Sequence, residues 1–346
     1  MLQSDKPLIV YYVHHHGSGH IAQFYSFAPH LLQKFRIHVI AAAKHVVSQI
    51  EAMALEHVTT SLMPSKWSAT TSEGFVHTFS RAFEGVPYRQ EPAIRSRWLA
   101  ELFINEKPAL FLSDGSIELS IMARSMGVRT VFVHLHGHFK QDPTQVFAHE
   151  VSDALIAPYP VEMEDKTYPY KDKTFYTGYF SKYQLNDRAV ATDERVSILL
   201  GYDNASREVL SRITENASYS FSVIGNKMPV IERENVRAYG RVDDIKKYIT
   251  GEVVITAAGT NSIAELLTLG KKLILLPEDR PYDEQLHTAE LLAQHEYAVL
   301  ARADMTSEQW HDAIEHARKI DVSRVDQLIN PHAAEMVTQW LGEQYA

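Results

Sequence analysis

Short apolar segments rich in β-formers alternate with amphipathic helical segments along almost the whole chain of 346 residues. In the first half, strands are predicted at 8–13, 36–42, 109–113, 129–135 and 154–157, with helices at 21–33, 45–55, 93–105 and 117–126. Buried strands separated by helices form parallel sheets whose two faces are both covered. The alternation therefore predicts an α/β fold built from βαβ units.

The same pattern restarts after a polar, aperiodic stretch at 183–194, which is typical of a linker. Strands are predicted at 195–200, 219–224, 236–239, 252–256 and 271–276, and helices at 205–214, 262–269, 284–295, 307–319 and 332–343. We expect two doubly wound, Rossmann-like domains, 1–184 and 185–330, that face each other across a cleft. We expect residues 331–346 to form a C-terminal helix that packs back on the first domain. Ligands of such folds bind at the carboxyl ends of the strands.

Composition narrows the function classes. The chain has 34 basic and 43 acidic side chains and a net charge of −9, which argues against general nucleic-acid binding. It has no cysteine, which excludes disulfides, thiolate metal sites and cysteine nucleophiles. The first apolar run is too short for a signal peptide, and no run of about 18 apolar residues exists. We expect a cytoplasmic protein, with peripheral contact at the inner face of the membrane left open.

The turn after the first strand contains Gly17, Gly19 and His20. Glycines between a strand and a helix let the backbone approach an anion, and the helix N-terminus supplies N–H donors. A dinucleotide cofactor is disfavoured, because a third glycine is missing and segment 40–43 offers no acid for a ribose. His20 is a candidate general base, since histidine titrates near neutral pH. A histidine that only caps the helix is an equal alternative.

Asp114 follows another predicted strand of the same sheet. A carboxylate beside His20 would fix the tautomer of its imidazole and stabilise the imidazolium. Asp114 is also a candidate N-cap of the following helix, and the two roles are not exclusive.

His134, His136 and His138 end a further strand, where alternation would place all three on one side. We expect them to line a polar cleft rather than bind metal, because no carboxylate spacing completes a metal site.

Segment 64–97 interleaves aromatic and arginine residues. It is interpreted as a loop and helix that pack on the first domain, with an acceptor-binding or membrane-touching flap as the alternative.

The strongest local pattern is the turn Gly259-Thr260-Asn261-Ser262 between a buried strand and a helix. Its N–H groups and hydroxyls can cradle a diphosphate. Glu265, three residues after Ser262, could complete a capping box or reach a sugar diol. Further along, Glu284 and Gln285 form an acid–amide pair, which supplies both acceptors and donors for a neutral polyol.

Segment 236–300 resembles the donor-binding domain of GT-B glycosyltransferases, especially glycosyltransferase family 28 and the UDP-glycosyltransferases. The resemblance rests on Gly259-x-Asn261-Ser262-x-x-Glu265, then Gly270, Pro277, Glu284-Gln285 and Ala289. Gly17-Ser18-Gly19-His20 and Leu112-Ser113-Asp114 resemble the family's glycine-rich turn and the strand end that carries the acidic partner of the base. The similarity extends over both halves, but its motifs are specific only around 256–290.

The resemblance implies a GT-B fold and an inverting transfer of a sugar from a nucleotide donor, with UDP preferred, to an acceptor hydroxyl. His20 would be the base and Asp114 its partner. Gly17 and Gly19 would belong to the donor site, Gly259, Thr260, Asn261 and Ser262 would bind the diphosphate, Glu265 the ribose, and Glu284 with Gln285 the sugar. No cofactor or metal is implied, and the acceptor could be a glycan, a lipid-linked saccharide or a small molecule.

Departures from the family pattern limit what carries over. Ala257 stands where many UDP-glycosyltransferases have a phosphate-binding histidine, and also where retaining GT-B enzymes have a second glutamate. Segment 201–204 lacks the second glycine-rich turn of the peptidoglycan N-acetylglucosaminyltransferase.

A sugar-nucleotide hydrolase and a non-catalytic nucleotide-sugar binding protein remain as alternatives. A 2-epimerase is disfavoured, because the first turn offers no further acid.

Overall fold

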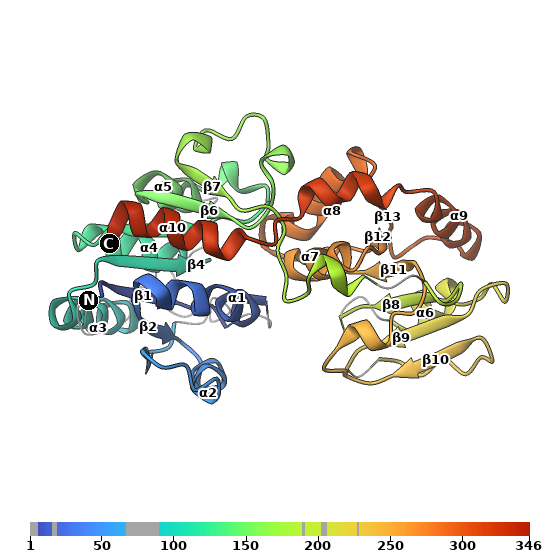
Figure 1. Ribbon diagram of the computed structural model, residues 1–346, viewed down its shortest axis with the longest axis horizontal. Helices are drawn as coiled ribbons and strands as arrows, with labels where there is room; N and C mark the ends of the chain where they lie inside the picture. The colour runs from blue at the N-terminus through green and yellow to red at the C-terminus, as the bar shows by residue number, and fades with distance from the viewer. Residues whose placement is uncertain (1–5, 16–18, 67–89, 189–190, 202–205, 227) are drawn as a thin grey trace.

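The computed structural model describes residues 6–15, 19–66, 90–188, 191–201, 206–226 and 228–346, arranged as two α/β domains side by side (Figure 1). The first domain contains a 7-stranded sheet of order β3-β2-β1-β4-β5-β6-β7, in which every pair is parallel. Its strands are β1 Leu8–Tyr12, β2 Arg36–Ala41, β3 Val58–Leu62, β4 Leu110–Asp114, β5 Thr130–Val133, β6 Ala154–Ala157 and β7 Thr174–Tyr176. The predicted α/β fold is confirmed.

Helices cover both faces of this sheet, which explains why β1 is apolar throughout. Ile9 and Tyr11 face one core, which includes Phe24 of α1, while Val10 faces a second core with Leu99 of α3. Successive residues of a strand point to opposite faces, so a strand covered on both sides needs no polar residue. The helices of this domain are α1 Gly19–Lys34, α2 Lys44–Ala52, α3 Glu91–Glu106, α4 Ile117–Ser125 and α5 Pro143–Val151.

The second domain contains a 6-stranded parallel sheet of order β10-β9-β8-β11-β12-β13. Its strands are β8 Val196–Leu199, β9 Phe221–Ile224, β10 Val236–Tyr239, β11 Val253–Thr256, β12 Lys272–Leu275 and β13 Ala298–Leu300. Its helices are α6 Arg207–Ile213, α7 Thr260–Thr268, α8 Glu284–Gln294 and α9 Ser307–Arg318. In both sheets the order reverses beside the first strand, as in doubly wound folds.

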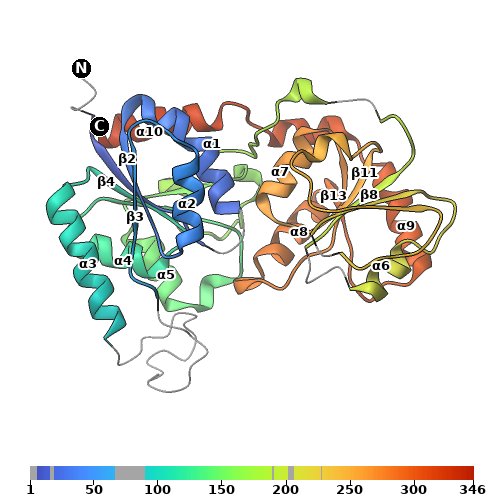
Figure 2. The same cartoon turned by 90° about the horizontal axis from the view of Figure 1, so that it is seen from below.

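The last helix, α10 Ala333–Tyr345, crosses back from the second domain and lies along α1 of the first (Figures 1 and 2). Val337 and Leu341 are buried in the core that contains Phe24 and Leu31 of α1. The Trp340 ring stacks on Phe175 of β7, with ring centroids 4.9 Å apart. The two domains are therefore joined both by the linker and by this returning helix.

Several elements differ from the sequence-based expectations. Three strands, β3, β7 and β13, were not predicted, because they are short or only half-buried edge segments without an apolar run. Helix α5 was also not predicted. The strand predicted at 129–135 ends at Val133, so His134 and His136 lie beyond it. Within segment 64–97, helix α3 begins at Glu91, and residues 67–89 lie outside the described residues, so the proposed flap is not tested. None of the described helices is long and apolar enough to cross a membrane.

Candidate active site

His20 and Asp114 meet at the carboxyl edge of the first sheet. Strands β1 and β4 are parallel neighbours, and His20 is the second residue of α1, the helix that follows β1. The Nδ1 atom of His20 lies 2.9 Å from Oδ2 of Asp114. The Asp114 side chain is buried, whereas the imidazole keeps 19% of its surface exposed. The structure thus brings together the two residues that the sequence analysis paired.

Charges on both domains act on His20. Burial lowers the pKa of the imidazole, but the charge and hydrogen bond of Asp114, with the charge of Glu284, outweigh burial and raise the pKa. Asp114 does not cap the helix after it: Ser116 accepts the N–H of Leu119 as the N-cap of α4. The capping role predicted for Asp114 is therefore wrong.

The turn after β11 begins helix α7 earlier than expected. Gly259 occupies the N-cap position, so no side chain caps the helix. Thr260 is the first helical residue. Ser262 consequently lies inside the first turn, so the helix starts two residues before its predicted start and the Ser262–Glu265 capping box is wrong. The first N–H groups of an α-helix have no partner within the helix. At α7 these groups lie at the carboxyl end of β11, beside the half-buried side chains of Thr260, Asn261 and Ser262.

Glu265 is half-buried on α7, with Nζ of Lys182 at 3.5 Å from its carboxylate. Burial raises the pKa of Glu265 and outweighs the attraction of Lys182. Next to Lys182, the Tyr183 hydroxyl donates to Asp244 Oδ1 at 2.9 Å. The sequence analysis missed Lys182 and Tyr183, because they lie at the start of the linker region and carry no motif that associates them with α7.

Gln285 and Glu284, adjacent at the start of α8, have different surroundings. The buried Gln285 uses its Oε1 to accept the backbone N–H groups of Ala258, at 3.2 Å, and Glu278, at 2.9 Å. Gln285 therefore links the ends of β11 and β12. Burial raises the pKa of Glu284, against the opposing charges of His20 and Arg280. Of the pair, Glu284 is the residue coupled to the first domain.

A direct hydrogen bond connects the two glycine-containing turns. Asn261 Nδ2 donates to the Gly19 carbonyl at 2.9 Å, so the N-termini of α1 and α7 touch. A Cβ at Gly19 would lie only 2.9 Å from that nitrogen, so a larger residue there would displace the Asn261 side chain. Gly17 lies outside the described residues.

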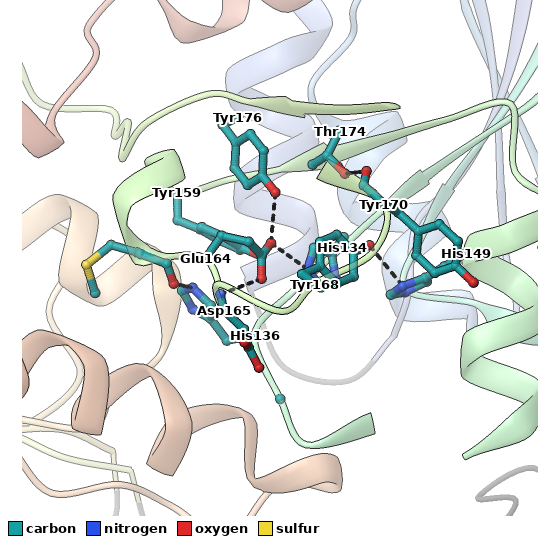
Figure 3. Close-up of polar contacts among 12 residues, drawn as sticks. His134, His136, His149, Tyr159, Glu164, Asp165, Tyr168, Tyr170, Thr174 and Tyr176 are labelled. Atoms are coloured by element: carbon teal, nitrogen blue, oxygen red, sulfur yellow. Dashed lines mark hydrogen bonds and ion pairs between the residues drawn. The ribbon is translucent and has the colours of Figure 1, made fainter. Parts of the chain in front are cut away.

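The histidines after β5 are engaged within the protein. His134 and His136 are buried: His134 Nε2 lies 3.1 Å from Glu164 Oε2, and His136 Nε2 lies 3.0 Å from the Met163 carbonyl (Figure 3). Glu164 also accepts the hydroxyl of Tyr159, whose ring stacks on His136. Burial lowers the pKa of His136 to about 3.

These positions correct the expectation that the three histidines share one side of a strand, because β5 ends at Val133. His136 and His138 lie instead at the contact with α8. Among the residues that the structure describes, no group of three or more His, Asp or Glu side chains has a geometry that could hold a metal ion.

Comparisons with known proteins agree with this architecture. Residues 211–324 match the glycosyltransferase family 28 C-terminal domain, and none of the curated proteins searched matches the chain. The glycotransferase of kitacinnamycin is 12% identical, with a TM-score of 0.73 over 99% of this chain and 100% of that one.

Two further structures give similar values. A UDP-glucosyltransferase from Polygonum tinctorium is 11% identical, with a TM-score of 0.70 over 98% of both chains. The spinosyn rhamnosyltransferase SpnG, complexed with thymidine diphosphate, is 14% identical, with a TM-score of 0.69 over 96% of this chain and 99% of that one. The protein thus has the GT-B glycosyltransferase fold, and its second domain is of the glycosyltransferase family 28 C-terminal type.

Proposed function

We propose that this protein is an inverting glycosyltransferase that moves a sugar from a nucleoside diphosphate donor to an acceptor hydroxyl. The observation that carries the proposal is the 2.9 Å contact between His20 Nδ1 and the buried Asp114, on a chain whose other domain matches a family 28 donor domain. Asp114 holds a proton on Nδ1, which leaves Nε2 of His20 as the basic nitrogen.

In the proposed reaction, Nε2 of His20 accepts the proton of the acceptor hydroxyl while the hydroxyl oxygen attacks the anomeric carbon. The bond from that carbon to the diphosphate oxygen breaks on the opposite face, which inverts the configuration. The unpartnered N–H groups at the start of α7 stabilise the negative charge on the leaving diphosphate. Glu265 binds the ribose, and Glu284 contacts the donor sugar.

UDP and TDP are the first nucleotides to test, since the similar structures include a UDP-glucosyltransferase and a rhamnosyltransferase complexed with thymidine diphosphate. Thermal unfolding is measured with UDP, TDP, GDP and ADP, with CMP as the monophosphate control. A diphosphate at about a hundred times its Kd adds roughly 2.7 kcal/mol of stability. If no nucleotide raises the melting temperature, the proposed nucleotide-binding site is contradicted.

Two substitutions separate catalysis from donor binding. His20→Ala is expected to lower transfer by roughly 10²- to 10⁴-fold with nucleotide affinity nearly intact, because a general base acts on the acceptor. Glu265→Ala is expected to show the opposite pattern, with a larger loss of nucleotide affinity than of transfer rate at saturating donor. The measurements are product formation and calorimetric titration with the stabilising nucleotide. Wild-type turnover in His20→Ala would contradict the assignment of the base.

Product analysis distinguishes transfer from hydrolysis on the same scaffold. With the stabilising nucleotide sugar and a panel of hydroxyl acceptors, a transferase forms a glycoside with the opposite anomeric configuration to the donor. Free sugar released at the same rate with and without acceptors would instead identify a hydrolase that uses His20 on water.

A further inference from the structure

We propose that segment 136–138 of the first domain positions the Glu284 carboxylate by holding the first turn of α8, with His287 as a positioning residue. The role of Glu284 at the donor sugar rests on the proposed function, whereas the positioning itself does not. Glu284, on the second domain, thus depends on the first domain for the position from which its charge acts on His20.

Three contacts join the segment to residues on both sides of Glu284. They are His138 N to the Tyr282 carbonyl (2.7 Å), Gly137 N to His287 Nδ1 (3.0 Å) and His136 Nδ1 to Thr288 Oγ1 (3.0 Å). One contact precedes Glu284 in the sequence and two follow it. The first turn of α8 is therefore held at both of its ends by the other domain.

The backbone before Glu284 has a conformation that needs external support. Tyr282 and Asp283 have φ values of 61° and 53°, in the left-handed region that non-glycine residues rarely adopt. Such residues persist where surrounding contacts hold them in place. Here the support comes from the first domain, through the bond to the Tyr282 carbonyl and through the Tyr282 hydroxyl, which donates to Asp142 Oδ2 at 2.8 Å.

The segment approaches Tyr282, just before α8, more closely than a side chain at its centre would easily allow. Gly137 has a φ of 148°, and a Cβ there would lie 3.0 Å from Cβ and 3.1 Å from the carbonyl oxygen of Tyr282. Glycine is therefore required by both the conformation and the close approach. His287 must be unprotonated at Nδ1, because that atom accepts the N–H of Gly137.

His20 offers a direct report of where Glu284 lies. The charge of Glu284 raises the pKa of His20, together with the charge and hydrogen bond of Asp114 and against the effect of burial. The His14 ring also lies nearby, with centroids 5.2 Å apart. If the first turn of α8 moved away, the contribution of Glu284 would decrease while Asp114, on the first domain, stayed in place.

The test is an NMR titration of His20 in the full-length, ligand-free protein. Glu284→Gln is expected to lower the pKa of His20. The size of this decrease is the reference for the other variants, because it measures the whole contribution of the Glu284 charge. His287→Ala is expected to lower it by part of that amount, because the contacts of Tyr282 and Thr288 remain, and to speed amide exchange of Gly137 by roughly tenfold, as loss of one hydrogen bond allows. His287→Asn keeps an acceptor near the position of Nδ1 and is expected to restore wild-type values.

Two further variants keep the result interpretable. His295→Ala removes the exposed imidazole that ends α8 and is expected to change neither value. Gly137→Ala, which forces the segments apart, is expected to reproduce the pKa decrease of His287→Ala. An unchanged His20 pKa in His287→Ala or in Glu284→Gln would overturn the proposal. Because no donor is present, failure of nucleotide binding would contradict the proposed function alone.

Discussion

At the scale of single residues, the His20–Asp114 pair makes the pH dependence of the reaction predictable. Only neutral His20 can accept a proton, so kcat/KM is expected to rise with pH through the pKa of His20. That pKa is raised above 6.5, because the charge and hydrogen bond of Asp114 and the charge of Glu284 outweigh burial. The rising limb of the pH profile is therefore expected above pH 6.5.

Asp114→Asn removes the charge and keeps the shape of the side chain. The rising limb is expected to move to lower pH, because a positively charged imidazole loses its nearest compensating charge. The maximal rate is expected to fall by roughly 10²- to 10⁴-fold, since the orientation and basicity of His20 both suffer. The measurement is kcat/KM against pH for both proteins. A limb at the wild-type position would show that His20 is not the titrating base.

Some of these residue contacts were predictable from the sequence and others were not. His20 and Asp114 each follow a strand, and carboxyl ends of parallel strands share one edge of a sheet, so their proximity follows from a local pattern. The contacts of His136 and Gly137 could not be foreseen in this way. Their partners, Thr288 and His287, lie on the other domain, about which local periodicity carries no information.

At the scale of elements, Gln285 organises the edge of the second sheet where the diphosphate is proposed to bind. Gln285→Leu leaves the N–H groups of Ala258 and Glu278 without their acceptor. Each buried N–H left unpaired costs roughly 1–3 kcal/mol, so a loss of about 2–6 kcal/mol is expected for the two groups. The measurement is urea unfolding of the second domain. The control is Leu286→Gln at the adjacent exposed position. A loss below about 1 kcal/mol would show that water replaces the amide oxygen.

Some elements were placed closely from the sequence alone. Helices α7 and α8 and strand β10 lie within two residues of their predicted bounds. Strand β3 was missed because the Thr and Ser residues of its VTTSL sequence are at least partly exposed. The start of α7 was placed too late because Thr260 and Asn261 were assigned to the turn, whereas the N-cap is Gly259 and both residues are helical. A glycine cap leaves the helix N-terminus open to a ligand.

At the scale of the whole molecule, buried histidines at and near the domain contact make stability sensitive to acid. Burial lowers the pKa of His136 to about 3 and that of His149 well below its ordinary value. In the unfolded chain both titrate near 6.5. Between these values the unfolded state binds more protons, so stability falls as pH falls below about 6.5. His20 acts in the opposite direction, because its pKa is raised in the folded state.

The expected loss at pH 5 is roughly 2 kcal/mol for His136, since one pKa unit corresponds to about 1.4 kcal/mol, and His149 acts in the same direction. Urea unfolding from about pH 7.5 to pH 5 measures the slope. His136→Gln keeps a donor near Nε2 for the Met163 carbonyl but cannot titrate. It is expected to be less stable than the wild type at pH 7.5 and to have a shallower slope. A slope equal to that of the wild type would mean that acid acts elsewhere, and that the domain contact keeps its strength as the pH falls.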